Sequence, residues 1–317
     1  MPPQPQGPAL TGTLRIFQVA GISVYVHWSW LVIAAIEFQF RRDAYGNYFW
    51  PILEYVSLFG IVLLHEFGHA FACRQVGGRA DSIVLWPLGG VALVMPPPRP
   101  GAWLWSIVAG PLVNVVLVPI TIGLVFAGRA GGLEETDDFD KFLVALAAMN
   151  VGLLVFNMLP IYPLDGGQAL HALLWFVIGR AKSLMVACIV GLIGAVAFIG
   201  VAIFALDIWI GIMAAMGAYR CWQGIQQARL MSRIEEAPRH LDATCPSCDA
   251  HPLQGPFWQC DLCRARFDTF ETQAECPNCL QYFTTTMCPE CGASHPIWAW
   301  YDQKAPIPYR RRDDDES

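Results

Sequence analysis

Long apolar segments separated by short polar ones fill the first 222 residues of the chain. A membrane-crossing helix needs about 20 mostly apolar residues, and four segments come near that length. The last apolar segment is longer, since a straight helix over it would extend about 60 Å against a hydrocarbon core of about 30 Å. We therefore expect it to cross twice, with a turn near Asp207. The predicted spans are residues 24–40, 49–73, 103–127 and 142–160, and two within residues 183–222. Six spans result, or five if the last segment crosses once.

Two shorter segments depart from this pattern of long helices. Residues 80–95 contain Pro87, Gly89 and Gly90 among β-branched residues, which favours a short β-hairpin. Irregular backbone at membrane depth needs protein or water to satisfy its hydrogen bonds. A strand edge at this place can pair with an extended peptide. Residues 168–178 predict a short helix near the membrane interface.

The composition supports an integral membrane protein with a separate polar tail. Of the 317 residues, 55% are hydrophobic and 15% are charged, against about 25% charged residues in soluble domains. The formal net charge of −6 comes largely from an acidic loop and from the acidic C-terminal residues. No stripe of basic residues is present, so nucleic acid is not an expected partner. The first eight residues lack a basic segment followed by an apolar core, so we expect no cleaved signal peptide.

The basic residues between the spans predict which side of the membrane faces the cytosol. With six spans, one side receives the larger set, and the other receives the smaller set together with the acidic loop. We expect the first side to be cytosolic, with both termini on it; Arg41 and Arg42 are a local exception. The larger set is Arg15, Arg74, Arg79, Arg99, Arg180, Lys182, Arg220 and Arg229. The smaller set is Arg41, Arg42, Arg129 and Lys141.

The second predicted span contains the sequence His65-Glu66-Phe67-Gly68-His69. On a helix, His65 and His69 lie on one face, where one zinc ion can accept both imidazoles. Glu66 beside them can act as a general base toward a water molecule. The H-E-x-x-H pattern has only three fixed positions, so chance matches are common. Ionisable side chains in a membrane span are costly, which favours a metal site here over coincidence.

A carboxylate further along the chain is a candidate third ligand. Asp165 follows the fourth predicted span at a helix break and precedes Gly166 and Gly167. A zinc site with two histidines and one carboxylate leaves a fourth position for water. The alternative is that Asp165 is the N-cap of the next helix, a common role for aspartate. Together with the H-E-x-x-H helix, we favour the ligand.

Four motifs together give the chain a resemblance to the site-2 protease family of intramembrane zinc metalloproteases. They occur in the order of that family and at compatible spacings, over roughly residues 15–222. The motifs are His65-Glu66-Phe67-Gly68-His69, Pro87-Leu88-Gly89-Gly90, Gly110-Pro111-Leu112-Val113-Asn114 and residues 157–167. The resemblance implies an activity, intramembrane proteolysis, as well as a fold. The expected fold class is mainly α, a polytopic transmembrane helical bundle of about six spans with a short β-hairpin after the second span.

The resemblance implies a role for the matching residues. His65, His69 and Asp165 would bind a catalytic zinc ion, and Glu66 would be the catalytic base. Asn157 would position the substrate backbone or stabilise the oxyanion.

Three further residues are candidates for substrate binding, namely Gly89, Gly90 and Asn114. A helical substrate must unwind before its carbonyl can be attacked, and the hairpin with Gly89 and Gly90 could hold the unwound strand. Asn114, with Gly110 and Pro111, would shape the third span near the site. The alternative role for Gly110, Pro111 and Asn114 is close helix packing by small residues.

From about residue 235 the composition changes, and eight of the eleven cysteines occur as four C-x-x-C pairs. They supply eight thiolates, enough for two tetrahedral zinc sites of four cysteines each. Disulfides are the alternative, but the cytosol keeps thiols reduced. The pairs are Cys245 and Cys248, Cys260 and Cys263, Cys276 and Cys279, and Cys288 and Cys291.

This tail resembles a small cytosolic double zinc ribbon. The simplest pairing is sequential, with the first two C-x-x-C pairs on one zinc ion and the last two on the other; a nested arrangement is the alternative. His251 and His295 are spare ligand candidates. Because the tail has little apolar sequence, we expect its fold to depend on metal. The expected domains are an N-terminal segment 1–23, a metalloprotease domain 24–222, a linker 223–242, a zinc ribbon 243–296 and a charged tail 297–317.

We therefore expect a zinc-dependent intramembrane endopeptidase with one catalytic and two structural zinc ions. By the resemblance, its substrates are membrane-tethered regulators or remnant signal peptides, and its location is a prokaryotic cytoplasmic membrane. The expected partners are the lipid bilayer, a transmembrane substrate and a cytosolic partner of the ribbon. Two other classes stay open: a membrane-anchored scaffold with a non-catalytic metal site, and a transporter or metal permease. A requirement for Glu66 as a base would distinguish the enzyme from both.

Overall fold

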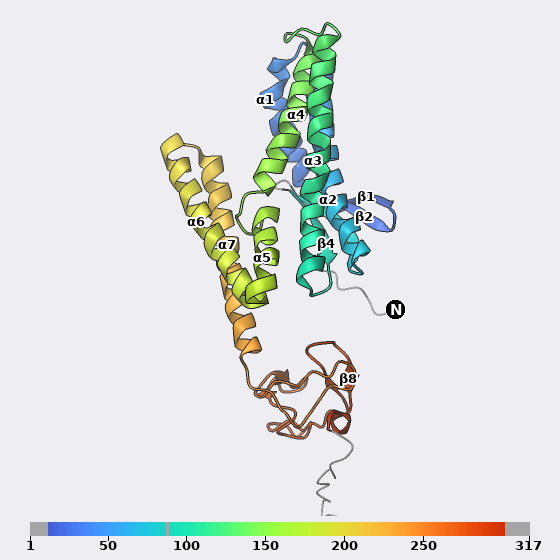
Figure 1. Ribbon diagram of the computed structural model, residues 1–317, viewed down its shortest axis with the longest axis vertical. Helices are drawn as coiled ribbons and strands as arrows, with labels where there is room; N and C mark the ends of the chain where they lie inside the picture. The colour runs from blue at the N-terminus through green and yellow to red at the C-terminus, as the bar shows by residue number, and fades with distance from the viewer. Residues whose placement is uncertain (1–11, 87–88, 302–317) are drawn as a thin grey trace, which may run out of the picture. The chain divides into compact units, whose positions relative to one another are not determined.

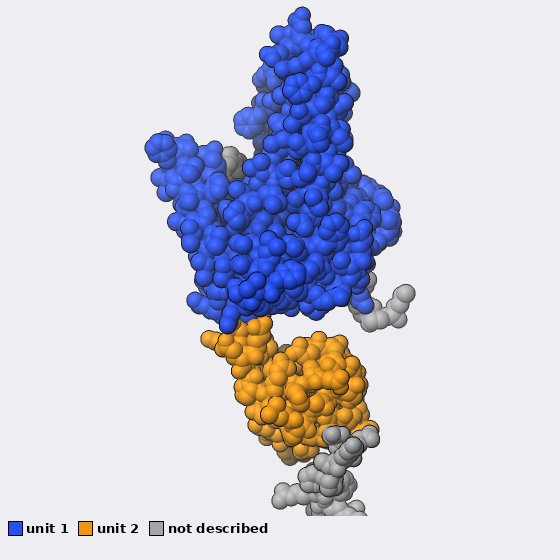
Figure 2. Space-filling model, in the orientation of Figure 1, with its two compact units in different colours: residues 1–229 blue, residues 230–317 orange. Residues whose placement is uncertain are grey.

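The computed structural model describes residues 12–86 and 89–301 of the chain. The chain divides into two compact units, residues 1–229 and residues 230–317 (Figure 2). Within the described residues, the first unit is mostly helical and contains a four-stranded sheet (Figure 1). The second unit consists of short strands and turns.

Four helices among the described residues are long and apolar enough to cross a membrane. Three of them, α2, α3 and α4, pack against one another (Figure 1). They cover the predicted second, third and fourth spans, and the fourth helix, α6, covers the first part of the last apolar segment. The bounds are α2 Phe49–Gln75, α3 Pro100–Ala130, α4 Asp138–Asn157 and α6 Arg180–Ala205.

Three other helices belong to the described chain: α1 (Ser29–Arg41), α5 (Asp165–Ile178) and α7 (Ile208–Glu235). Helix α1 has 13 residues and extends about 20 Å, less than the thickness of the hydrocarbon core. Helix α7 is longer, but its second half carries arginines and glutamines. The expected six crossings therefore stay a prediction, because α1 and α7 differ from the four apolar helices.

The predicted first span over residues 24–40 is not one continuous helix. Strand β2 (Ile22–His27) occupies its beginning, and α1 starts only at Ser29. Ile22 and Val24 are fully buried, whereas the residues between and after them are partly exposed. This alternation is typical of a strand. It is difficult to recognise in the sequence because it lies within an apolar run.

The sheet has the strand order β1-β2-β3-β4. Strand β2 pairs with β3 in parallel, and the other two pairings are antiparallel. Helices α1 and α2 form the crossover that a parallel pair requires. The predicted hairpin is confirmed as β3 and β4, and its turn at residues 87–88 lies outside the described residues. The remaining bounds are β1 Thr13–Val19, β3 Arg79–Trp86 and β4 Gly89–Met95.

Helix α2 holds this sheet in place. Its residues Val62, Ala70 and Cys73 share a hydrophobic core with buried residues of β2 and β3. Near the end of α2, Arg74 donates hydrogen bonds to the backbone carbonyls of Ala80, at 3.0 Å, and of Gly21, at 3.1 Å. The same helix therefore carries the H-E-x-x-H motif and anchors the sheet.

The predicted turn near Asp207 is present between α6 and α7. Helix α6 ends at Ala205, and Leu206 has a positive φ of 52°. The carboxylate of Asp207 accepts a hydrogen bond from the backbone N–H of Ile210 at 3.1 Å. Asp207 thus acts as an N-cap for α7.

The second unit has two short antiparallel pairs and a small apolar core. Phe270 and Trp300 lie at its centre, with Ala243 and Ile297 around them. Residues 297–301, predicted to belong to the charged tail, are therefore part of this unit, and α7 extends into the predicted linker to Glu235. The strands are β5 Trp258–Gln259, β6 Arg266–Phe267, β7 Thr286–Met287 and β8 Ser294–His295.

Candidate metal centres

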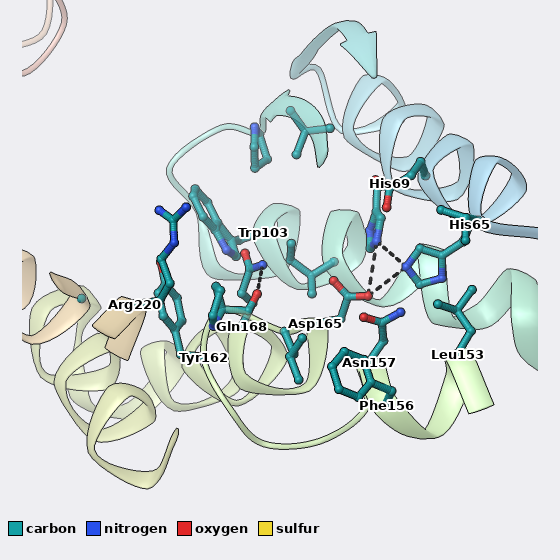
Figure 3. Close-up of a pocket in the computed structure, with 18 of the residues that line it drawn as sticks. His65, His69, Trp103, Leu153, Phe156, Asn157, Tyr162, Asp165, Gln168 and Arg220 are labelled. Atoms are coloured by element: carbon teal, nitrogen blue, oxygen red, sulfur yellow. Dashed lines mark hydrogen bonds and ion pairs between the residues drawn. The ribbon is translucent and has the colours of Figure 1, made fainter. Parts of the chain in front are cut away.

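His65, His69 and Asp165 meet inside the first unit (Figure 3). The two histidines lie one turn apart on α2, and the aspartate is the first residue of α5. The Nε2 atoms of His65 and His69 are 3.1 Å apart. The Oδ2 atom of Asp165 lies 3.0 Å from the Nε2 of His65 and 3.4 Å from the Nε2 of His69.

Asp165 does not act as a helix cap, which was the alternative for this residue. Leu164 is the N-cap of α5, and no side chain caps the helix. Gly166 and Gly167 allow the start of α5 to pack closely on the chain before it, because a Cβ at either glycine would overlap backbone atoms of Met158, Leu159 or Ile161. The carboxylate is therefore directed at the histidines.

The second nitrogen of each imidazole has an acceptor on α3. The Nδ1 of His69 lies 2.8 Å from the backbone carbonyl oxygen of Ser106, which can only accept. The Nδ1 of His65 lies 2.6 Å from the Oδ1 of Asn114. The amide nitrogen of Asn114 donates to the Oδ1 of Asn150 at 2.7 Å, so its oxygen faces His65. Both histidines therefore carry their proton on Nδ1 when neutral.

This protonation leaves three lone pairs directed at one point: two Nε2 atoms and a carboxylate oxygen. When both histidines are neutral, no proton lies between these atoms, and their approach to within 3.0–3.4 Å suits one metal cation bound by all three. A tetrahedral zinc site with ligand distances of about 2.0–2.1 Å has edges of about 3.4 Å. The donor set and the hydrogen bonds behind it fit zinc.

Close packing between α2 and α3 creates this arrangement. A Cβ at Gly110 would overlap the imidazole ring of His69, and a Cβ at Gly68 would lie 2.6 Å from the carbonyl oxygen of Ala109. Small residues at both positions let the two helices approach. Close helix packing therefore explains the glycine at position 110. Asn114 instead contacts the Nδ1 of His65, the ring nitrogen that does not face the metal position.

A cavity of about 640 Å³ opens next to the three candidate ligands (Figure 3). Glu66 and Asn157, both predicted from the sequence, line it. Other lining residues were not predicted, namely Trp103, Leu153, Phe156, Tyr162, Gln168, Arg220, Gln223 and Gln227. Most of them come from helix positions with no motif around them.

The remaining candidates for substrate binding lie at different places. Gly89 and Gly90 pair with Trp86 and Leu85 within the β3–β4 ladder. Asn114 is fully buried and hydrogen bonds to His65 and Asn150. Through this hydrogen bond, Asn114 orients the imidazole of the candidate metal ligand His65. Asn150 was not predicted, although a lone amide in an apolar helix is a signal.

The eight tail cysteines form two clusters with a nested pairing, so the sequential pairing is wrong. Within each cluster all ligand atoms lie within 4.8 Å of one another. The inner cluster is formed by the second and third C-x-x-C pairs, and the outer cluster by the first and fourth. The inner cluster is Cys260, Cys263, Cys276 and Cys279, and the outer cluster is Cys245, Cys248, Cys288 and Cys291.

The sulfur positions fit zinc better than disulfides. Neighbouring Sγ atoms are 3.5 and 3.6 Å apart in the inner cluster and 3.8 Å apart in the outer cluster. A tetrahedron with Zn–S distances of about 2.3 Å has edges of about 3.8 Å, whereas bonded sulfurs are about 2.0 Å apart. In the inner cluster, a hydrogen bond from the Asn278 side chain holds the pKa of the Cys263 thiol well below its usual range, at about 6.

All four C-x-x-C pairs have the same turn. The residue after the second cysteine has a positive φ, and its N–H bonds to the carbonyl of the first cysteine at 2.9–3.0 Å. Because the four turns are locally equivalent, the turn itself does not determine which pairs share a metal. These positive-φ residues are Asp249, Arg264, Leu280 and Gly292.

Contacts outside the turns select the nested pairing. Strands β5 and β6 adjoin the second C-x-x-C pair, and Phe283 from the segment after the third pair packs against them. The N–H of Thr244 donates to the carbonyl of Trp300 at 2.7 Å, which joins the two ends of the unit. His251 and His295, the spare candidates, bond instead to the carbonyl of Ala243 and the hydroxyl of Ser247.

The first unit thus has the features of a membrane-embedded metallopeptidase: apolar helices, a site of two histidines and one carboxylate, and a glutamate beside it. Comparison with known proteins agrees. The family model Peptidase family M50 matches residues 130–201, a stretch that contains Asn157 and Asp165. This match to the peptidase family M50 over residues 130–201 agrees with the resemblance to the site-2 proteases seen in the sequence.

Several relatives have names that include the words zinc metalloprotease. One, from Methanocaldococcus jannaschii, is 30% identical over 181 residues, 56% of this chain and 50% of that protein. Rip3 of Mycobacterium tuberculosis is 33% identical over 171 residues, 50% of this chain and 42% of that protein. The solved structure of the site-2 protease from Methanocaldococcus jannaschii aligns with a TM-score of 0.49 and 24% identity over 67% of this chain and 95% of that one. This chain spans about half the length of the curated relatives it matches.

Proposed function

We propose that this protein is a zinc-dependent intramembrane endopeptidase that cleaves transmembrane substrates within or near the bilayer. The observation that carries the proposal is the convergence of three lone pairs from His65, His69 and Asp165 beside a cavity that Glu66 also lines. Zinc, when bound, supplies Lewis acidity, which polarises a carbonyl and makes a water molecule more acidic.

The chain's own residues carry the proton transfers and the positioning. Glu66 adjoins the ligand His65 in sequence and lines the cavity; it takes the proton of the attacking water and later gives it to the leaving amine. Asn114 and the Ser106 carbonyl hold the two imidazoles in one tautomer and orientation. Asn157 lines the same cavity and can donate to the substrate carbonyl.

The substrate segment binds in an extended conformation. Strand β4 is an edge strand of the sheet, and Val94 near its end lines the cavity together with Pro96. An extended peptide could add to this edge through backbone hydrogen bonds, with Gly89 and Gly90 in the same strand. A substrate that unwinds easily is therefore preferred over a stable helix.

The membrane topology has both termini in the cytosol, in a prokaryotic cytoplasmic membrane. The larger number of basic residues on the cytosolic side supports this orientation. Arg41 donates to the fully buried carboxylate of Glu54 at 2.7 and 2.9 Å. Arg129 donates to both carboxylate oxygens of Asp140 at 2.9 Å. Two of the four basic residues on the other side are thus held in ion pairs.

The tail serves as a structural module with two zinc ions, beside one catalytic zinc ion in the first unit. Exposed apolar side chains such as Leu262 and Tyr282 lie on its surface and are available to a cytosolic partner. Substrates in this setting are membrane-tethered regulators or remnant signal peptides.

The test compares detergent-purified wild type with Glu66→Gln and with Glu134→Gln, which removes an exposed loop carboxylate. A model transmembrane substrate is offered to each, and zinc is counted by atomic emission. We expect about three zinc ions in every form and cleavage lost only in Glu66→Gln. Zinc confined to the tail, with no Glu66-dependent cleavage, would instead indicate a scaffold. Metal uptake that needs His65 and His69 but not Glu66 would indicate a permease.

A further inference from the structure

The cavity beside the metal site has a second polar region at the side of α7. Among the described residues that line the cavity, three carry a formal charge: Glu66 and Asp165 at the metal site, and Arg220 on α7. Gln223 and Gln227 line the cavity as well, and their spacing of three and seven residues from Arg220 places all three on one helix face. One face of α7 therefore presents a cation and two amides.

Helix α7 is fixed at this place by contacts with α6 and with the chain before Asp165. The Sγ of Cys221 donates to the backbone carbonyl of Tyr162 at 2.9 Å. A Cβ at Gly224 would overlap the Sγ of Cys188 on α6. Because these contacts are made by the residue after Arg220 and by the following turn of α7, its side chain projects from an anchored part of the helix.

This region and the metal site line the same cavity. Arg220 interacts electrostatically with Tyr162, and the two are drawn beside each other in Figure 3. Tyr162 precedes Asp165 by three residues, so their Cα atoms are at most about 11 Å apart.

Two donors in this region make no hydrogen bond or ion pair with the described residues. The Nε1 of Trp103, a cavity-lining residue, is buried and makes no hydrogen bond. The ring of Trp103 is held in place by the Arg180 guanidinium, which lies 5.7 Å from its centre. Arg220 forms no ion pair in the described part of the chain. The ion pairs found there use Arg41, Arg42, Arg74, Arg129, Lys141 and Arg239.

We propose that Arg220, with Gln223 and Gln227, forms a subsite for an acidic side chain of the substrate at a short distance from the scissile bond, in the same cavity. The proposal rests on the proteolytic function above. A guanidinium binds a carboxylate through two short, charge-assisted hydrogen bonds. The glutamine amides can both donate to and accept from the backbone of an extended peptide. The subsite selects substrates with Asp or Glu at this distance over uncharged ones.

The test uses model transmembrane substrates in which one position near the cleavage site is Asp, Asn or Lys. For the wild type in phosphatidylcholine vesicles we expect kcat/KM for the best-placed Asp substrate to exceed that of its Asn counterpart about tenfold. In Arg220→Gln this ratio falls to about one. In Arg220→Glu the preference changes to the Lys substrate. Arg229→Gln, on the same helix but outside the cavity lining, keeps the wild-type ratio.

Binding gives a readout that does not depend on catalysis. Fluorescently labelled Asp and Asn substrates are titrated against Glu66→Gln and against Glu66→Gln with Arg220→Gln, and the Asp preference should be lost only in the second. If Arg220→Gln lowers kcat/KM for Asp and Asn substrates equally, or changes neither, the subsite is wrong while the protease stands. If its effect depends on phosphatidylglycerol in the vesicles and not on the substrate's charge, the anion is a lipid phosphate and the proposal is overturned. Binding that depends on Arg220, without cleavage that depends on Glu66, would contradict the proposed proteolytic function but support the proposed subsite.

Discussion

Asn114 on α3 accepts a hydrogen bond from His65 on α2, with 2.6 Å between the amide Oδ1 and the imidazole Nδ1. Both side chains are buried. The amide is itself held by Asn150 on α4, so three helices determine the orientation of one candidate ligand. The chain of hydrogen bonds keeps the Nε2 lone pair of His65 directed at the metal position.

Removing the acceptor at Asn114 should weaken metal binding without removing a ligand. In Asn114→Leu, which has a similar volume, zinc affinity of the first unit should fall by about 10–100-fold. Asn114→Asp keeps an acceptor and should retain more affinity. Competition with a chelator measures the effect, and Thr121→Val serves as control because its hydroxyl bonds only to its own helix. Equal affinity of Asn114→Leu and wild type would contradict the positioning role.

A methyl group at Gly110 should displace His69. Gly110→Ala places a Cβ within the volume of the imidazole ring, so we expect loss of the catalytic zinc and of cleavage. Gly123→Ala on the same helix is the matched control, because no other atom lies within 4 Å of the added Cβ. Zinc counting and circular dichroism separate loss of metal from loss of fold. A Gly110→Ala protein with wild-type metal affinity would show that the ring has room to move.

The nested pairing in the tail predicts how zinc is lost when two cysteines are replaced. Cys248→Ser with Cys288→Ser affects only the outer site and should cost one zinc ion. Cys248→Ser with Cys263→Ser affects both sites and should cost two. Sequential pairing predicts the reverse numbers. Atomic emission on purified protein distinguishes the two arrangements, with the unaltered chain as reference.

The positive-φ position after the third C-x-x-C pair should tolerate glycine better than leucine. Leu280 has a φ of 60° and is 71% exposed, so Leu280→Gly relieves backbone strain and loses little packing. We expect the tail to gain up to about 1 kcal/mol in the free energy of opening. Gly292→Ala, at the equivalent position, should lose a similar amount. Hydrogen exchange over residues 258–295 measures both changes, and a loss of stability in Leu280→Gly would refute the argument.

The three residues that meet at the candidate metal site could be predicted from the sequence because their spacing is a local feature. His65 and His69 need only to be four residues apart on a helix, and Asp165 is recognisable beside two glycines at a helix break. The acceptor for His69 could not be predicted, since it is the backbone carbonyl of Ser106 and carries no side-chain signal. Arg220 was also missed as a cavity residue, because its position depends on how α7 packs.

The strands of the first unit and the cysteine pairing of the tail show a second limit of prediction from the sequence. Ile22 and Val24 alternate with less buried residues, but the whole segment is apolar, so the pattern is typical of a span as well. In the tail, all four turns have the same backbone hydrogen bond and a residue of positive φ after the second cysteine. The pairing depends instead on distant apolar residues such as Trp300, which brings the end of the unit back to Thr244.

The nested arrangement gives the two tail sites different folding costs. Joining Cys263 to Cys276 closes a separation of 13 residues, whereas joining Cys248 to Cys288 closes one of 40. The longer closure costs about 1 kcal/mol more in chain entropy. We therefore expect the inner cluster to bind zinc first during synthesis, which shortens the loop that the outer cluster must close. When zinc is scarce, we expect the outer cluster to lose its metal first, so that both ends of the unit come apart while the inner half stays folded.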